Sequence, residues 1–293
     1  MLTRYLLSHA LSLLGNSVAA VALPWLVLVR TGDAAVAGLI AAVSALPILV
    51  AAVAGGLLID RVGRRRTSIG ADIASAACVA ALPLVDQISG LTVAWFIVLG
   101  VAGALFDVPG MTARQALAPD IASAARVSLE RLAGLRQGVS GVVVVAGPAA
   151  AGGLLVLLDP TTMLWATAAC SAAAGIVTAT LPASVGARSE VSSGDQGARA
   201  GLGQGFNVLR RDRVLGTMTL ISTGSLLVLA PLQNIVLPVH FVVQDSPGGF
   251  GLVVAFLALG GIAGSGCTPP LVPDGRAARS LWRPRSPPPW VRS

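Results

Sequence analysis

The sequence GLLIDRVGRRR, at residues 56–66, shows how this chain is organised. Its last seven residues hold one aspartate and four arginines, and they stand between two runs that carry almost no charge. Residues 36–59 contain no charged side chain, and residues 67–85 contain only Asp72. A helix needs about 20 apolar residues to cross a bilayer, and both runs are long enough. Residues 60–66 therefore predict a tight turn between two membrane-spanning helices, which we call the 60–66 turn.

Asp60 is expected to need nearby positive charge, because it stands at the C-terminal end of a predicted helix. The helix macrodipole already places partial negative charge at that end. Arg61, Arg64 and Arg65 supply the cations, and Gly63 is free to take the positive φ that a tight turn requires.

The spacing of these residues resembles a family signature. The pattern G-x-x-x-D-R-x-G-R-R is similar to the loop between the second and third helices of the major facilitator superfamily, a family of secondary transporters built from two six-helix bundles. It is carried by Gly56, Asp60, Arg61, Gly63, Arg64 and Arg65. The resemblance implies that the turn is a latch between the bundles and that Asp60 stabilises one gating state. The alternative is an arginine cluster that only fixes topology.

The composition also places the chain in a membrane. Of 293 residues, 55% are hydrophobic and 11% are charged, and the mean hydropathy is +0.81. A soluble domain would expose more charge. We therefore expect an all-α, polytopic fold whose main partner is the lipid bilayer. The net charge of +7 does not indicate a nucleic-acid partner, because the arginines fall between apolar runs.

Apolar runs predict eight membrane spans, at residues 5–29, 36–59, 67–87, 91–110, 132–158, 162–182, 214–242 and 249–266. Residues 111–135 predict a connecting loop and the amphipathic start of the next helix. The first span is too long for a secretory signal and continues through Pro24 and Trp25, so a retained helix is predicted, with a cleaved signal as the alternative.

These spans suggest four regions. Residues 1–182 form a six-helix bundle, residues 183–213 a Gly/Ser-rich cytoplasmic linker, and residues 214–266 two helices of a second bundle. Residues 267–293 hold seven prolines, five arginines and no run able to span a bilayer, which predicts a disordered tail. The resemblance implies four further helices at this end, so the sequence predicts a truncated or frame-shifted product.

The arginines predict which side each loop faces. If the N-terminus is cytoplasmic, fourteen arginines lie in cytoplasmic segments before the tail and only Arg30 lies outside. The positive-inside rule therefore predicts a cytoplasmic N-terminus in the cell membrane.

Asp107 is the acid that most needs a partner, because it closes the fourth predicted span. This arrangement resembles that of related facilitators, in which an acid on the fourth helix pairs with the arginines of the corresponding turn. We expect an ion pair from Asp107 to one of those arginines, with Arg114 two helical turns away as the other candidate. The competing hypothesis is that Asp107 carries a transported proton.

The fifth span holds Gly147-Pro148 and Gly152-Gly153, which resembles the fifth-helix signature of drug-exporting facilitators. It departs from that signature at Ala151 and Val143, and a glycine-rich packing face is the alternative. Candidate substrate contacts are Asn16 in the first span and, in the seventh, Gln233 and Asn234. His9 shares a helix face with Asn16, where an interhelical hydrogen bond is the alternative role.

The resemblance implies secondary active transport by alternating access, with export of a small apolar or siderophore-like molecule. Coupling of this transport to protons is one version of the hypothesis. A truncated product that transports nothing and a membrane scaffold or partner subunit remain alternatives. No Ser/His/Asp, paired-carboxylate or metal constellation indicates an enzyme. Three separated cysteines and two lone histidines predict no disulfide framework, metal or cofactor.

Overall fold

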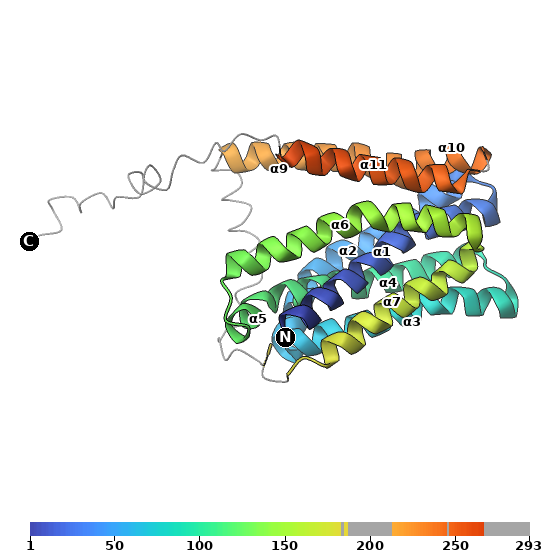
Figure 1. Ribbon diagram of the computed structural model, residues 1–293. Coiled ribbons are helices and arrows are strands. Elements are labelled where there is room, and N and C mark those ends of the chain that lie inside the picture. Colours follow the sequence, from blue (N-terminus) through green and yellow to red (C-terminus); the bar gives the residue numbers. More distant parts are fainter. Residues whose placement is uncertain (183–184, 187–212, 245, 267–293) are drawn as a thin grey trace, which may run out of the picture.

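The computed structural model describes residues 1–182, 185–186, 213–244 and 246–266, and these ranges are helical with no strand (Figure 1). The predicted tail at 267–293 and nearly all of the predicted linker at 183–213 lie outside the described residues. So do a few side chains within helices, including that of Asp60. The prediction of an all-α, polytopic fold is confirmed.

Six long helices make up the first part of the chain. They are α1 (Leu2–Thr31), α2 (Ala34–Val62), α3 (Arg64–Ser89), α4 (Val93–Ala116), α6 (Leu129–Leu157) and α7 (Pro160–Ala179). A short helix, α5 (Ala118–Ala124), connects α4 to α6. The helix ends follow the local sequence: Asp33, Ser128 and Asp159 each accept a backbone N–H at the start of a helix. At Asp159, hydrogen bonds from Thr162 hold the pKa of the carboxyl below its ordinary value.

The second part contains α9 (Arg213–Pro231), a π-helical turn η1 (Leu232–Val236), α10 (Leu237–Val243) and α11 (Pro247–Gly266). The π turn has a local cause. Pro238 has no N–H to donate to the carbonyl of Asn234, and its ring would clash with that carbonyl in a regular helix. A single wider turn relieves this conflict, and such turns are frequent at functional sites.

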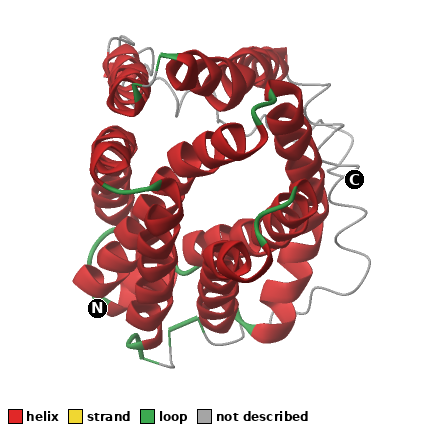
Figure 2. Cartoon of the chain, turned by 90° about the vertical axis from the view of Figure 1, so that its right-hand side faces the viewer, coloured by secondary structure: helices red, strands yellow, loops and turns green. Residues whose placement is uncertain are grey.

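The long helices lie side by side and run roughly along one direction, as Figure 1 shows, and Figure 2 views them nearly end-on. α1 packs against α6 and α7, α3 packs against α4 and α7, and α2 packs against α4. α11 packs against α6 and lies with α9 and α10 along one side of the first bundle (Figure 1). A ring contact between Trp25 on α1 and Phe250 on α11, with centroids 6.3 Å apart, joins the two parts.

Length and hydropathy agree with membrane spans. Six helical segments within the described residues are long and apolar enough to cross a bilayer, and α2 and α11 contribute shorter apolar stretches at Ala34–Ser44 and Gly248–Gly261. Large apolar side chains such as Ile88, Val142 and Ile176 point outward and are more than 60% exposed. In lipid this exposure is favourable, so the chain is a multi-pass membrane protein.

The 60–66 turn has the backbone conformation that its sequence predicts. Gly63 has φ +95°, ends α2 and precedes α3, so the two helices are joined by a single glycine. An L side chain would be strained in this region of φ. The Thr67 hydroxyl donates to the Gly63 carbonyl at 2.9 Å, which satisfies one backbone group at the joint.

Candidate functional site

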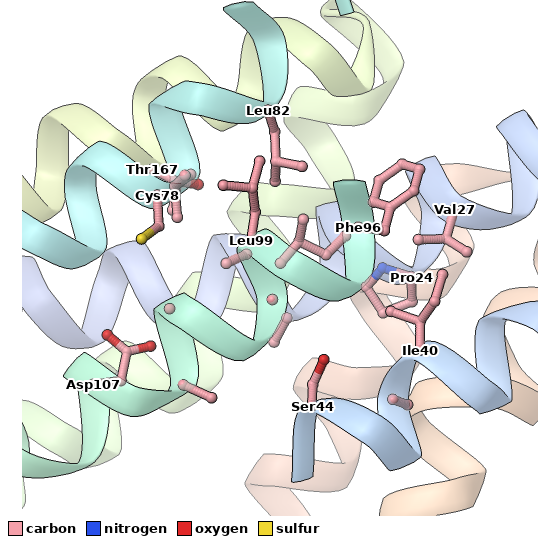
Figure 3. A pocket seen from close by; sticks show the side chains of 18 of the residues that line it. Pro24, Val27, Ile40, Ser44, Cys78, Leu82, Phe96, Leu99, Asp107 and Thr167 are labelled. Atoms are coloured by element: carbon pink, nitrogen blue, oxygen red, sulfur yellow. The ribbon is translucent and has the colours of Figure 1, made fainter. Parts of the chain in front are cut away.

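A cavity of about 380 Å³ lies inside the bundle, and we call it the apolar cavity. Helices α1, α2, α3, α4 and α7 line it, and Asn234 of η1 closes one side. Its apolar lining includes Pro24, Val27, Ile40, Leu82, Phe96 and Leu99, which Figure 3 shows. This size lies within the range of sites that hold drug-sized ligands.

The apolar cavity carries little charge. Among the described residues that line it, Asp107 is the one carboxylate, and no Arg, Lys or His is present. Figure 3 shows Asp107 and Cys78 at one end of the cavity and Phe96 at the other. Hydroxyl and amide groups from Asn16, Ser44, Ser75, Thr167, Ser171 and Asn234 are the remaining polar groups.

A second cavity, of about 230 Å³, lies toward the end of the bundle that carries the N-terminus. We call it the polar cavity, because charged and polar side chains dominate its lining. These are His9, Ser12, Asn16, Asp72, Asp107, Arg114, Gln115, Arg136, Gln137 and Ser140. His9 is buried, and its Nε2 lies 3.0 Å from the Ser140 hydroxyl, so it forms the interhelical hydrogen bond between α1 and α6.

Asn16 and Asp107 line both cavities, so they stand where the apolar and polar cavities meet. Asn16 comes from the middle of α1 and Asp107 from α4. Ser75 of α3 lines the apolar cavity together with Asp107. A ligand at this junction would therefore meet one carboxyl group and one amide.

A buried ion pair between Asp72 of α3 and Arg114 of α4 forms the wall of the polar cavity. The two side chains are only 8% and 6% exposed. Ser12 of α1 donates to the other Asp72 oxygen at 3.5 Å, and the buried Tyr5 hydroxyl donates to the Arg114 carbonyl at 3.0 Å. Three helices are thus joined by one charged cluster, in which the Arg114 Nε has no partner among the described residues.

The ion pair therefore differs from the one expected from the sequence. Arg114 is paired with Asp72, and no described arginine forms an ion pair with Asp107. The physical reason is that α4 does not end near residue 110 but continues to Ala116, which carries Arg114 back into the bundle beside α3. Asp107 instead faces the cavities, next to Ser75.

Two arginines of the 60–66 turn, Arg64 and Arg65, bind residues other than Asp107. Arg64 forms an ion pair with Asp120 of α5 at 3.3 Å, and both side chains are about one third exposed. Arg65 donates to the Ala179 carbonyl at 2.6 Å, and Arg4 donates to the Thr180 carbonyl at 3.0 Å. Both cations thereby bind the C-terminal end of α7, where they complement the helix dipole. Gly56 is exposed, and the latch role of Asp60 stays a prediction because its side chain lies outside the described residues.

The four residues of the α6 motif do not share one role. A Cβ added at Gly147 would lie 2.5 Å from the Ser17 Cβ, so Gly147 allows α1 to approach closely. Pro148 and Gly152 instead lie against α11. A Cβ added at Gly251 of α11 would lie 2.5 Å from the Pro148 carbonyl oxygen and 2.6 Å from the Gly152 Cα. Gly153 has open space around it. The motif therefore holds α6 tightly between the two parts of the chain.

Two of the three predicted substrate contacts line a cavity. Asn16 lines both cavities, and Asn234 lines the apolar cavity while its Nδ2 donates to the Ala230 carbonyl at 2.8 Å. Gln233, its neighbour in η1, lines neither cavity. Among the described residues, no group of three or more His, Cys, Asp or Glu stands close enough to hold a metal ion.

Comparison with known proteins agrees with this architecture. The family model described as "Major Facilitator Superfamily" matches residues 5–284, which is nearly the whole chain. The chain belongs to the major facilitator superfamily. No solved structure matches it significantly.

Curated relatives of this facilitator are named for efflux. The chain is 32% identical over 257 residues to the "Multidrug efflux pump Tap" of Mycobacterium tuberculosis, covering 86% of this chain and 61% of the relative. It is 30% identical over 254 residues to the protein of the same name from Mycolicibacterium fortuitum, covering 86% and 62%. The chain thus spans about three fifths of the length of the curated relatives it matches.

The sequence of this facilitator did not single out the apolar lining of the cavity or the Asp72–Arg114 pair. Phe96 and Leu99 stand in apolar runs where residues that face lipid and residues that face a cavity look alike. Arg136 offered a usable signal, because a charged side chain within a predicted span usually faces the interior. It lines the polar cavity.

Proposed function

We propose that this facilitator exports small, largely apolar molecules across the cell membrane and that it binds them in the apolar cavity. The observation that carries the proposal is a cavity of about 380 Å³ in the middle of a membrane bundle, lined mainly by aliphatic and aromatic side chains. The curated relatives, which are named as multidrug efflux pumps, support outward transport and a drug-like substrate class.

The position of the cavity supports alternating access as the mechanism. Its walls come from five helices of the first bundle and from Asn234 of η1, which belongs to the second part. We propose residues 1–182 and 214–266 as two parts that rock against each other around this site, with the 60–66 turn as a latch. The close approach of Gly251 to α6 and the Trp25–Phe250 contact are the described contacts that such a movement would have to change.

The lining supports a drug-like rather than a siderophore-like substrate. A siderophore presents many polar oxygens, and each oxygen that loses water on binding needs a hydrogen-bond donor. The apolar cavity offers only a few hydroxyl and amide groups among its 23 lining residues.

The proposed orientation has the N-terminus in the cytoplasm. The arginines at 4, 64, 65, 126 and 131 belong to the end of the bundle formed by the start of α1, the α2–α3 joint and α5. Arg30, which pairs with Asp86, belongs to the opposite end. This asymmetry supports the positive-inside assignment and a place in the cell membrane.

A variant that fills the cavity tests the proposal. Gly103 lines the apolar cavity, and an added Cβ there would meet no atom of the described residues within 4 Å. Gly103→Leu should therefore occupy the cavity without a clash, and leucine also favours the helix. We expect purified Gly103→Leu protein to bind the neutral dye Nile red at least about tenfold more weakly than the parent, which corresponds to about 1.4 kcal/mol.

Gly138→Leu is the matched control, because Gly138 is an exposed glycine within α6 that also has open space around it. It should bind Nile red as the parent does. In cells that lack their own dye-efflux pumps, the parent and the control should lower Nile red retention, and Gly103→Leu should not. Binding without any change in retention would favour the alternative of a non-transporting chain. Equal binding by all three proteins would place the ligand elsewhere.

A further inference from the structure

Arg136 is a cation without a partner inside the membrane bundle. It lies two helical turns into α6, and its side chain lines the polar cavity. The ion pairs of the described residues use other arginines, and Arg136 forms no side-chain hydrogen bond among them. A charged side chain at membrane depth usually has a partner of opposite charge. At Arg136 that charge is left for a ligand to supply.

Arg114 brings a second guanidinium group to the polar cavity. Its side chain is only 6% exposed, and although its Nη2 pairs with Asp72, its Nε is buried without a hydrogen-bond partner among the described residues. The charges of Arg114 and Arg136 both act on His9, so the two guanidinium groups lie near the same imidazole. A buried N–H group without an acceptor costs free energy, and an acceptor that reached it from the cavity would remove that cost.

The two carboxyl groups of the polar cavity do not balance Arg136. Asp72 is already paired with Arg114. The charged groups that act on Asp107 are Asp72 and Arg114, and Arg136 is not among them. Asp107 also forms no ion pair with a described residue, and burial disfavours the charged form of an unpaired carboxyl group. The polar cavity therefore keeps an excess of positive charge at Arg136.

We propose that the polar cavity is a binding site for a carboxylate or a similar oxyanion, with Arg136 as its main cation and the Arg114 Nε as a second donor. The planar guanidinium group matches a carboxylate, which it can bind through two parallel hydrogen bonds. Two sources supply this chemistry. One is a free anion, and the other is the acid group of a ligand whose apolar body lies in the apolar cavity, which adjoins the polar cavity at Asn16. Neither arginine lines the apolar cavity, so the inference goes beyond the proposed function.

Sodium acetate tests for a free anion on the purified full chain. Acetate should raise the thermal denaturation temperature by about 2–4 °C relative to chloride at the same ionic strength, which is the shift expected a few times above the dissociation constant. Arg136→Gln removes the charge and should abolish this difference. Arg136→Lys should retain part of it, because the charge remains although the bidentate contact is lost.

Arg131→Gln is the matched control, because it removes the same charge from an exposed position of α6 outside the polar cavity. It should keep the acetate effect of the parent. This comparison separates binding at Arg136 from the general effect of acetate on protein stability, which all the variants share.

The pair 2-naphthoate and 2-naphthamide tests for an acid group on a larger ligand. The two compounds share one apolar body and differ in a charged or a neutral head group. The ratio of their constants for displacing Nile red therefore compares the head groups alone. If one ligand occupies both cavities, the parent and Arg131→Gln should favour 2-naphthoate, and Arg136→Gln should lower this preference at least about tenfold.

The two measurements together identify the source of the anion. An acetate shift that needs Arg136, with a naphthoate ratio that does not, would assign the site to a free anion. A ratio that falls in Arg136→Gln would assign it to a ligand that spans both cavities. If Arg136→Gln matches the parent in both measurements, the inference is wrong. Failure of the parent to bind Nile red would contradict the proposed function alone, because the acetate measurement needs no dye and then decides the inference by itself.

Discussion

At the scale of single residues, the buried Asp72–Arg114 pair connects α3 and α4, and hydrogen bonds join it to α1. Breaking such a pair from one side leaves an uncompensated buried charge, which typically costs about 3–5 kcal/mol. We therefore predict that Asp72→Asn and Arg114→Met each strongly lower the thermal denaturation temperature of the purified protein. The double variant Asp72→Leu, Arg114→Met should recover most of that loss, because no charge then remains buried.

The Arg64–Asp120 pair provides a more exposed control for this prediction. Both of its side chains are about one third exposed, so solvent screens their charges. Asp120→Asn should change stability by less than about 1 kcal/mol. If the exposed and buried pairs had equal effects in thermal unfolding, the buried cluster would not be the one that joins α1, α3 and α4.

At the scale of helices, the contact between α6 and α11 depends on a missing side chain. A Cβ at Gly251 would lie 2.5 Å from the Pro148 carbonyl oxygen, and backbone atoms cannot move aside cheaply. We predict that Gly251→Ala destabilises the protein by about 1–3 kcal/mol through overpacking. Gly260→Ala on the same helix meets no atom within 4 Å and should be neutral or slightly stabilising. Thermal denaturation of the two variants in parallel checks this, and equal stability would mean that α11 does not pack on α6 through Gly251.

The positions of the helices could be predicted from the sequence, because a run of about 20 apolar residues is enough to indicate a membrane-spanning helix. The predicted span at 36–59 corresponds to α2 (Ala34–Val62), and the joint at Gly63 falls at the charged turn. The end of α4 could not be placed in this way. Arg114 looks like a residue of a polar loop, and only the presence of Asp72 on the adjacent α3 makes it an interior residue.

The site was harder to predict than the fold, because a sequence shows which side chains are polar but not which helices are neighbours. Asp107 and Asn16 stood out as polar residues in apolar runs, and both line the cavities. The partner predicted for Asp107 differs from the structure because the sequence does not show which polar side chains α2 and α3, the two helices packed along α4, bring to it. Asp72 of α3 pairs with Arg114 of α4.

At the scale of the whole molecule, the arginines should decide how the bundle sits in the bilayer. Positively charged loops resist translocation, so the end that carries α5 and the 60–66 turn should remain in the cytoplasm. Thr92, just before α4, and Ala124, at the end of α5, are exposed at opposite ends of the chain segment 93–124. Single cysteines at these two positions, in a background without the three native cysteines, therefore report the orientation. We predict that a membrane-impermeant maleimide added to intact cells modifies Thr92→Cys but not Ala124→Cys, and that both are modified after the cells are permeabilised. Modification of Ala124→Cys in intact cells, with Thr92→Cys protected, would reverse the orientation and with it the direction of transport that the proposed function assigns.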